Sequence, residues 1–394
     1  MGVTIQEPQC SVASDRTRFP SAKVRHRLPF PIIRGRRMFL KNCWYVCAWD
    51  HELIDGRLLS RVLLNERVLL YRGDSGKLVA VSDRCPHRGA LLSQGRLEGD
   101  AVRCMYHGIK FDCTGRCVQI PGQEMIPPKM RIRAYPVHQV GHLVWIWMGD
   151  PALADPAKIL SLPYMTDPAW KGLPGYLHYD ANYLLIVDNL SDLAHLAFVH
   201  TNTLGGSEEY AYVSKPAAID RNERGYTLER WHMNIDPPPF HKKVIPDKTQ
   251  KLDRRNRVSM VVPGIFDMAT LFAPAGMGAE KGVAVEGARE YRNCQFMTPE
   301  TDKTTHFFWA YLNNYEGDDS TISRSLLDSL IEGFLEDKAI IEQQQKTLEE
   351  DPAFEQQMLA IHADAPLVHF RRTLARLMDA ERQGATSAAA QAAG

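Results

Sequence analysis

The chain of 394 residues is 44% hydrophobic and 24% charged, a balance typical of a globular protein with room for about two domains. Its 47 basic and 47 acidic residues cancel, which gives no support for nucleic-acid binding. No apolar run approaches the roughly 18 residues of a membrane span, and the N-terminus lacks the apolar stretch of an export signal. We therefore expect a cytoplasmic protein with neither a membrane nor a nucleic-acid partner, in which clustered cysteines bind metal instead of forming disulfides.

The first part of the chain alternates short β-rich runs with turns. Residues 1–37 read as an extended arm, and residues 38–150 as a small all-β domain. A Gly73-Asp-Ser-Gly76 turn between two such runs predicts a hairpin. Strands are expected at residues 67–71, 77–81, 101–105, 110–112 and 142–148.

A proline-rich stretch after residue 149 marks the start of a second domain. We expect this domain at residues 151–380, followed by a flexible tail at 381–394. Residues 182–200 and 323–350 have helical patterns, whereas 257–262 and 306–312 have those of strands. The predicted fold class is α+β: an all-β domain, then an α+β domain with an antiparallel sheet and covering helices.

The predicted β domain contains a group of four soft metal ligands. Cys85 and His87 form Cys-x-His, and after sixteen residues Cys104 and His107 form Cys-x-x-His. A zinc ion would take all four residues on one tetrahedral site. A [2Fe–2S] cluster would take the cysteines on one iron and the histidines on the other, which is a Rieske centre. Zinc knuckles usually begin with two cysteines, so the spacing favours the cluster.

A second group of polar residues lies in the predicted helix at 182–200. Asn189, Asp192 and His195 are three residues apart and would share one helix face. His200 lies five residues after His195, about 140° round a regular helix. Two imidazoles on one metal ion therefore require a π-bulge or a helix end between Leu196 and His200.

The long helix predicted at 323–350 offers a carboxylate. Asp337 occupies a position that the apolar stripe would give to a hydrophobic residue, between Phe334 and Ile341. A buried carboxylate is costly unless it is paired or binds metal. Alternatively, Glu336 and Asp337 belong to a solvated charged run. The pattern alone leaves both interpretations open.

The cysteine–histidine segment and the Asn-x-x-Asp-x-x-His-x(4)-His motif together resemble the oxygenase components (alpha subunits) of Rieske non-haem iron oxygenases. Ile109, where many members have Trp, is more similar to the branch of vanillate and dicamba O-demethylases. The resemblance implies one [2Fe–2S] cluster and one mononuclear Fe(II). The implied cluster ligands are Cys85, His87, Cys104 and His107, and the implied iron ligands are His195, His200 and Asp337.

The resemblance also implies how the two metals communicate. Asp192 would hydrogen-bond His195 and reach the equivalent of His107 on a neighbouring subunit, within a homotrimer. Asn189 would lie near the iron without being a regular ligand. Electrons would come from NAD(P)H through a reductase or ferredoxin, with O2 as co-substrate, and Arg84, Arg88 and Arg103 are candidates for the docking patch.

The resemblance implies oxidation of a small aromatic substrate. We expect monooxygenation or O-demethylation of an aromatic acid that is carboxylated and can be methoxylated. Ring dihydroxylation to a cis-diol is the alternative, and a zinc-stapled binding protein is an alternative of another class. The pocket walls are expected at residues 264–276 and 298–314. Within them His306 would either contact a polar group of the substrate or have a role in the core or at the surface.

Overall fold

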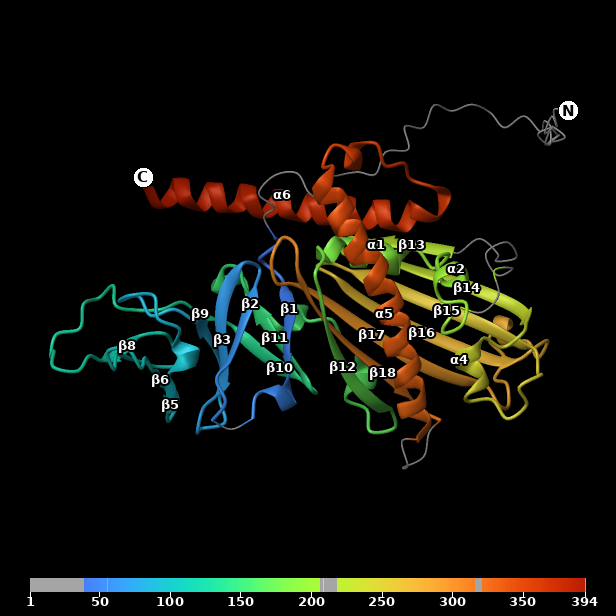
Figure 1. The fold of residues 1–394 in the computed structure, drawn as a ribbon, viewed down its shortest axis with the longest axis horizontal. Helices are drawn as coiled ribbons and strands as arrows, with labels where there is room; N and C mark the ends of the chain where they lie inside the picture. The colour runs from blue at the N-terminus through green and yellow to red at the C-terminus, as the bar shows by residue number, and fades with distance from the viewer. Residues whose placement is uncertain (1–38, 55, 206–207, 209–217, 316–320, 394) are drawn as a thin grey trace, which may run out of the picture.

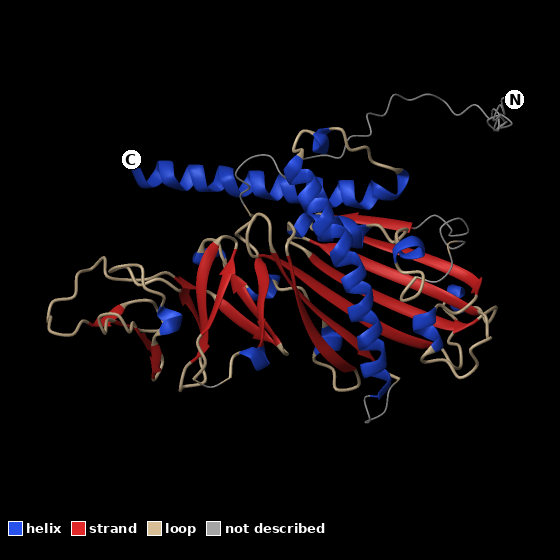
Figure 2. Cartoon of the chain, viewed as in Figure 1, coloured by secondary structure: helices blue, strands red, loops and turns tan. Residues whose placement is uncertain are grey.

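The computed structural model describes residues 39–393 except 55, 206–207, 209–217 and 316–320 (Figure 1). The predicted N-terminal arm lies outside the described residues. A β-rich N-terminal part and a larger sheet covered by helices lie side by side (Figure 2). The predicted fold class is therefore confirmed.

The N-terminal part contains three antiparallel sheets, with strand orders β1-β11-β10, β2-β3-β4-β9 and β5-β6-β7-β8. The hairpin predicted around Gly73–Gly76 is present as β3 and β4. The strands are β1 (Trp44–Trp49), β2 (Leu59–Leu63), β3 (Glu66–Arg72), β4 (Leu78–Ser82), β5 (Arg96–Glu98), β6 (Ala101–Arg103), β7 (Lys110–Phe111), β8 (Cys117–Gln119), β9 (Ala134–Tyr135), β10 (Val137–Val140) and β11 (Leu143–Trp147).

The second part is built on a seven-stranded antiparallel sheet with the order β12-β18-β17-β16-β15-β14-β13. The strands predicted at 257–262 and 306–312 lie within β15 and β18. The strands are β12 (Lys171–Tyr179), β13 (Ala218–Asn222), β14 (Gly225–Ile235), β15 (Leu252–Val261), β16 (Ile265–Pro274), β17 (Arg289–Pro299) and β18 (Thr305–Asn313).

Helices cover one face of this sheet. The long helix α5 crosses it, and α1 lies between α5 and α6 (Figure 1). The helix α6 continues through the segment expected as a tail, where Glu381 accepts the backbone N–H of Asn42 at 2.7 Å. No helix among the described residues is long and apolar enough to cross a membrane. The helices are α1 (Tyr183–Ser191), α2 (Leu196–Val199), α4 (Pro239–Lys242), α5 (Thr321–Glu350) and α6 (Ala365–Ala393).

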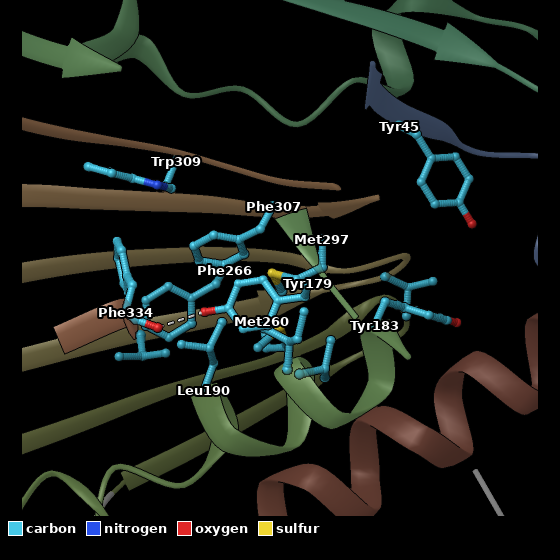
Figure 3. Close-up of a cluster of buried hydrophobic side chains, with 14 of the residues drawn as sticks. Tyr45, Tyr179, Tyr183, Leu190, Met260, Phe266, Met297, Phe307, Trp309 and Phe334 are labelled. Atoms are coloured by element: carbon cyan, nitrogen blue, oxygen red, sulfur yellow. Dashed lines mark hydrogen bonds between the residues drawn. The ribbon is translucent and has the colours of Figure 1, made fainter. Parts of the chain in front are cut away.

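The sheet is buried on both faces where the two parts of the chain meet. All nine residues of β18 are buried. Phe307 and Trp309 pack under Phe334 of α5, where the hydroxyl of Tyr179 donates to the Phe334 carbonyl (Figure 3). The alternate residues of β18, such as Phe308, join a cluster that contains Trp145 of β11. The two parts therefore share a continuous core, which fixes the sheet relative to the N-terminal part.

Candidate metal centres

The two cysteine loops of the N-terminal part have the same backbone shape. The N–H of Cys85 and of Cys104 each donates to the carbonyl five residues later, at 2.8 Å. Gly89 and Gly108 each donate back to the cysteine carbonyl at 2.9 Å, with φ of 74° and 70°. This left-handed conformation favours glycine, which explains the residue four places after each cysteine. The loops thus form a matched pair.

This pair of loops places the thiols inside and the imidazoles outside. Cys85 and Cys104 are 2% and 1% exposed, whereas His87 and His107 are exposed with ring centroids 4.4 Å apart. Burial raises the pKa of the Cys85 thiol, and the neighbouring Cys104 thiol raises it further. Two buried soft ligands and two outer imidazoles fit a cluster whose outer iron is held by histidine.

Arg103 is not available for the expected docking patch. Its guanidinium binds the Glu98 carboxylate at 2.6 and 2.7 Å and donates to the Gly108 carbonyl at 2.6 Å. It therefore braces the second cysteine loop. Arg84 and Arg88 are exposed and remain the candidates for that patch.

The segment predicted as one helix at 182–200 is broken in two. The helix α1 ends at Ser191, and Asp192 is extended with φ −110° and ψ 99°. A single turn, α2, follows and ends at Val199, directly before His200. The predicted helix end before His200 is present, but the shared face of Asn189, Asp192 and His195 was wrong because the chain leaves the helix at Asp192.

This break brings the two imidazoles to one carboxylate. Oδ1 of Asp337 lies 3.1 Å from Nε2 of His200 and 3.6 Å from Nε2 of His195. One ligand atom from each of the three residues lies within 4.8 Å of the others. Both Nε2 atoms are buried without a hydrogen-bond partner among the described residues. The two Nε2 lone pairs point toward the Asp337 carboxylate without a hydrogen bond. This arrangement fits a divalent cation bound by two histidines and one carboxylate.

The other ring nitrogens hold the histidines in this orientation. Nδ1–H of His195 donates to the backbone carbonyl of Asp192, and Nδ1–H of His200 donates to Oε2 of Glu336 at 2.7 Å. Each bond places the proton on Nδ1 and leaves the Nε2 lone pair for a metal. From the sequence, Glu336 was named only as part of a solvated charged run, and its role as the partner of His200 was missed.

Asn189 and Asp192 contact the group of His195, His200 and Asp337, here called the triad, in different ways. Nδ2 of Asn189 donates to Oδ1 of Asp337 at 2.9 Å, which orients the carboxylate. The Asp192 carboxylate instead accepts the N–H of Ala194 at 2.8 Å and shapes the turn that leads to His195. The expected bond between Asp192 and His195 is thus made by the backbone.

The pKa values of the two histidines differ because of these contacts. Burial lowers the pKa of His195 more than the Asp337 carboxylate raises it. Burial also acts to lower the pKa of His200, but Asp337 and Glu336 outweigh it and raise the pKa. Two carboxylates around one imidazole make this a site of negative potential, which attracts a cation.

A cavity of about 70 Å³ lies between the triad and the sheet. Side chains such as Leu193, Leu196 and Leu204 make its helix side apolar, while polar side chains of β15 and β17 line its sheet side. This volume is far below the roughly 300 Å³ of a typical small-molecule site, so an aromatic substrate requires the side chains around the cavity to move.

His306 does not line this cavity, so of its two expected roles it has the one in the core. Its Nε2–H donates to the Val62 carbonyl at 2.9 Å, and its Nδ1 accepts the Tyr176 hydroxyl at 2.8 Å. The segment 264–276 contributes to the cavity, but no residue of 298–314 does. His306 instead joins β18 to β2 of the N-terminal part.

Family models match both parts of the chain. Residues 43–136 match the Rieske [2Fe-2S] domain, and residues 179–380 match the vanillate O-demethylase oxygenase C-terminal domain. The chain is 45% identical to the toluene-4-sulfonate monooxygenase system iron-sulfur subunit of Comamonas testosteroni, over 88% of this chain and 99% of that one. It is 32% identical to the vanillate O-demethylase oxygenase subunit of a Pseudomonas strain, over 89% and 98% of the two chains.

Solved structures agree with these relatives. Dicamba monooxygenase bound to 3,6-dichlorosalicylic acid superimposes with a TM-score of 0.81 at 29% identity, covering 89% of this chain and 99% of that one. A structure of the same enzyme with non-haem iron and dicamba has a TM-score of 0.75. The alternative of a zinc-stapled binding protein is therefore wrong. The chain belongs to the Rieske non-haem iron oxygenases, as an aromatic oxygenase component of the family with the vanillate O-demethylase oxygenase C-terminal domain.

Proposed function

We propose that this chain is the terminal oxygenase of a cytoplasmic multicomponent system that inserts one oxygen atom from O2 into a small aromatic acid. A methoxylated substrate would be O-demethylated with release of formaldehyde. The observation that carries this proposal is the convergence of two unpaired Nε2 atoms and one carboxylate at the wall of an enclosed, largely apolar cavity. The named activities of the relatives, on toluene-4-sulfonate and vanillate, support the substrate class.

The proposed site residues divide the work between two metals. Cys85, Cys104, His87 and His107 would hold the [2Fe–2S] cluster, and His195, His200 and Asp337 the mononuclear iron. When bound, the cluster supplies electrons one at a time and the ferrous iron supplies O2 activation.

The chain's own side chains prepare the mononuclear site. Glu336 and the Asp192 carbonyl keep the protons of His200 and His195 on Nδ1, while Asn189 orients Asp337. Because His195, His200 and Asp337 supply only three ligands, a bound ferrous iron would keep positions open for O2. The leucine side chains of α2 and its flanks exclude bulk water there, which protects reactive oxygen species from side reactions.

Electrons would reach the cluster from a reductase or ferredoxin that draws on NAD(P)H. The exposed Arg84 and Arg88 of the first cysteine loop form the surface for this contact. The strands β5–β8 that carry the second cysteine loop lie at the opposite end of the molecule from α2 (Figure 1). We therefore propose a head-to-tail homotrimer, in which Asp192 of one copy faces the cluster of the next.

Isotope labelling tests the proposed reaction. Purified protein with a reductase and NADH is supplied with ¹⁸O2 and a panel of aromatic acids, and the products are analysed by mass spectrometry. Incorporation of one labelled atom, or formaldehyde from a methoxylated acid, is the expected result. A cis-diol with two labelled atoms would instead assign ring dihydroxylation.

A further inference from the structure

Polar side chains line the sheet side of the cavity in an otherwise apolar core. Arg254 and Asn256 point to it from β15, and Asn293 and Gln295 from β17. These four residues, here called the polar floor, are between 2% and 5% exposed. Within each pair the residues alternate along the strand, so both face the helices. Burying four such groups beside leucines is unfavourable unless they are hydrogen-bonded.

The hydrogen bonds that the polar floor makes within itself and with Thr270 are long. The Thr270 hydroxyl lies 3.4 Å from Oδ1 of Asn256, and Nε2 of Gln295 lies 3.4 Å from Oδ1 of Asn293. Both distances exceed the usual 2.7–3.2 Å. Oε1 of Gln295 is buried without a hydrogen-bond partner among the described residues. The carboxamides can therefore turn toward a ligand at little cost in existing bonds.

Arg254 supplies the positive charge at the polar floor. Its neighbours His232 and His241 are neutral: burial, followed by the charge of Arg254, lowers the pKa of His232 to about 3 and that of His241 well below its ordinary value. Arg254 also makes a further interaction within the chain. A guanidinium has five N–H donors, so it can keep a structural contact and still bind a second acceptor in bidentate fashion.

His241 of α4 is a further buried polar group near Arg254, although it does not line the cavity. It is 1% exposed, and both ring nitrogens lack a hydrogen-bond partner among the described residues. Its ring packs edge-on against Phe272, which lies opposite Arg254 in the strand register. Like Gln295, His241 shows that the polar groups on this side of the cavity are not fully hydrogen-bonded among the described residues.

We propose that the polar floor is the subsite for the acid group of the aromatic substrate, a carboxylate or sulfonate oxyanion. This inference rests on the proposed oxygenation of an aromatic acid. Arg254 binds the oxyanion, and Asn256, Asn293 and Gln295 orient it. The triad lies on the helix side of the same cavity. The aromatic ring of the substrate, with the carbon that is oxidised, would therefore lie between the bound acid group and the mononuclear iron. The polar floor thus sets both the substrate class and the position that is oxidised.

Direct binding to the metal-loaded protein tests this proposal. Calorimetry measures Kd for 4-methylbenzoate, toluene-4-sulfonate and neutral 4-methylbenzamide. The wild type is expected to bind at least one acid more tightly than the amide, and the tighter acid identifies which oxyanion the subsite takes. In Arg254→Gln, that acid should bind on the order of 10- to 100-fold more weakly, while the amide stays within about threefold.

The neighbouring arginine provides a matched control. Arg255 lies on the other sheet face, where it pairs with Glu290 at 3.5 Å and stacks over Trp231, so Arg255→Gln should leave all three Kd values unchanged. If Arg254→Gln fails to fold, Asn293→Asp serves instead, because it adds a repelling charge without changing size and should weaken the acids alone.

Three results would overturn the proposal: equal losses for acid and amide in the variants, no loss at all, or wild-type protein that prefers the amide. Because binding is measured without turnover, the proposed subsite and the proposed oxygenation reaction are tested independently. An acid that binds through Arg254 but is not oxidised contradicts the proposed function only. Oxidation of an acid that binds Arg254→Gln as tightly as the wild type contradicts the subsite only.

Discussion

At the residue scale, Glu336 is the side chain that gives His200 its direction. Its Oε2 accepts Nδ1–H of His200 at 2.7 Å and the Thr203 hydroxyl at 2.8 Å. A carboxylate behind a metal-binding imidazole fixes the ring and raises the basicity of the far nitrogen. Glu336 thus belongs to the metal site although it does not face the metal.

Replacing Glu336 with Gln should weaken binding of the mononuclear iron by on the order of 10-fold, because a neutral amide is a poorer acceptor. The measurement is an Fe(II) titration after selective chelation of that site, with the visible spectrum of the cluster as the check on the other metal. Glu332→Gln, on an exposed position of the same helix, is the control. Equal iron affinity in both variants would rule out this role.

The sequence predicted site residues best where a polar residue interrupts a local apolar pattern. Asp337 breaks the apolar stripe of α5, which raised the metal-ligand interpretation, and the resemblance then favoured it. The stripe could not show that Glu336 turns toward His200. His306 was a candidate for the pocket because it lies in the segment 298–314 that was expected to wall the site. Its partner, the Val62 carbonyl, comes from the other part of the chain and leaves no trace in the local sequence.

At the element scale, the joint between α1 and α2 determines the site. Asn189, Asp192 and His195 have helical spacing, so periodicity predicted a continuous helix. Asp192 instead forms a turn in which its own carboxylate accepts the N–H of Ala194, a bond that aspartate offers in competition with the helix. Only the pairing of both histidines with Asp337, which is tertiary, selects the broken form.

Asp192→Asn tests the proposed role of this joint in electron transfer. Asparagine can still accept the Ala194 N–H, so both metals should remain bound, but the loss of charge should slow electron transfer between cluster and iron by at least about tenfold. Single-turnover oxidation of the reduced protein, followed at the cluster absorbance, measures it. A wild-type rate would remove Asp192 from the path.

At the scale of the whole molecule, His306 makes the junction between the two parts sensitive to acid. Burial, followed by the charge of Arg61, lowers its pKa from 6.5 to about 4. Between pH 6.5 and 4, His306 is protonated in the unfolded chain but not in the folded chain. The free energy of unfolding therefore falls as the pH falls through this range. The contribution is on the order of 1–3 kcal/mol.

Thermal unfolding across this pH range measures the effect. The decline of Tm toward pH 4 should be shallower in His306→Gln than in the wild type, whereas replacement of the exposed His138 should leave the slope unchanged. An identical slope in His306→Gln would show that the junction does not carry this proton linkage.

Mixing two defective proteins tests the trimer and its electron path. Cys104→Ser should lack the cluster, and Asp337→Ala should lack the mononuclear iron, so each alone should be inactive. If electrons cross between copies, refolded or co-expressed mixtures should recover part of the activity. Mixed oligomers that contain both variants yet stay inactive would contradict a path between copies.

The count of iron against acid-labile sulfide tests the central claim most directly. The wild type should hold one more iron atom than sulfide atoms per chain, because the cluster contains equal numbers and the triad holds one iron. Asp337→Ala should lose that extra atom and keep the cluster spectrum, while Asp328→Ala, exposed on the same helix, should keep it. An Asp337→Ala protein with undiminished iron would contradict the assignment of His195, His200 and Asp337 as the oxygen-activating site.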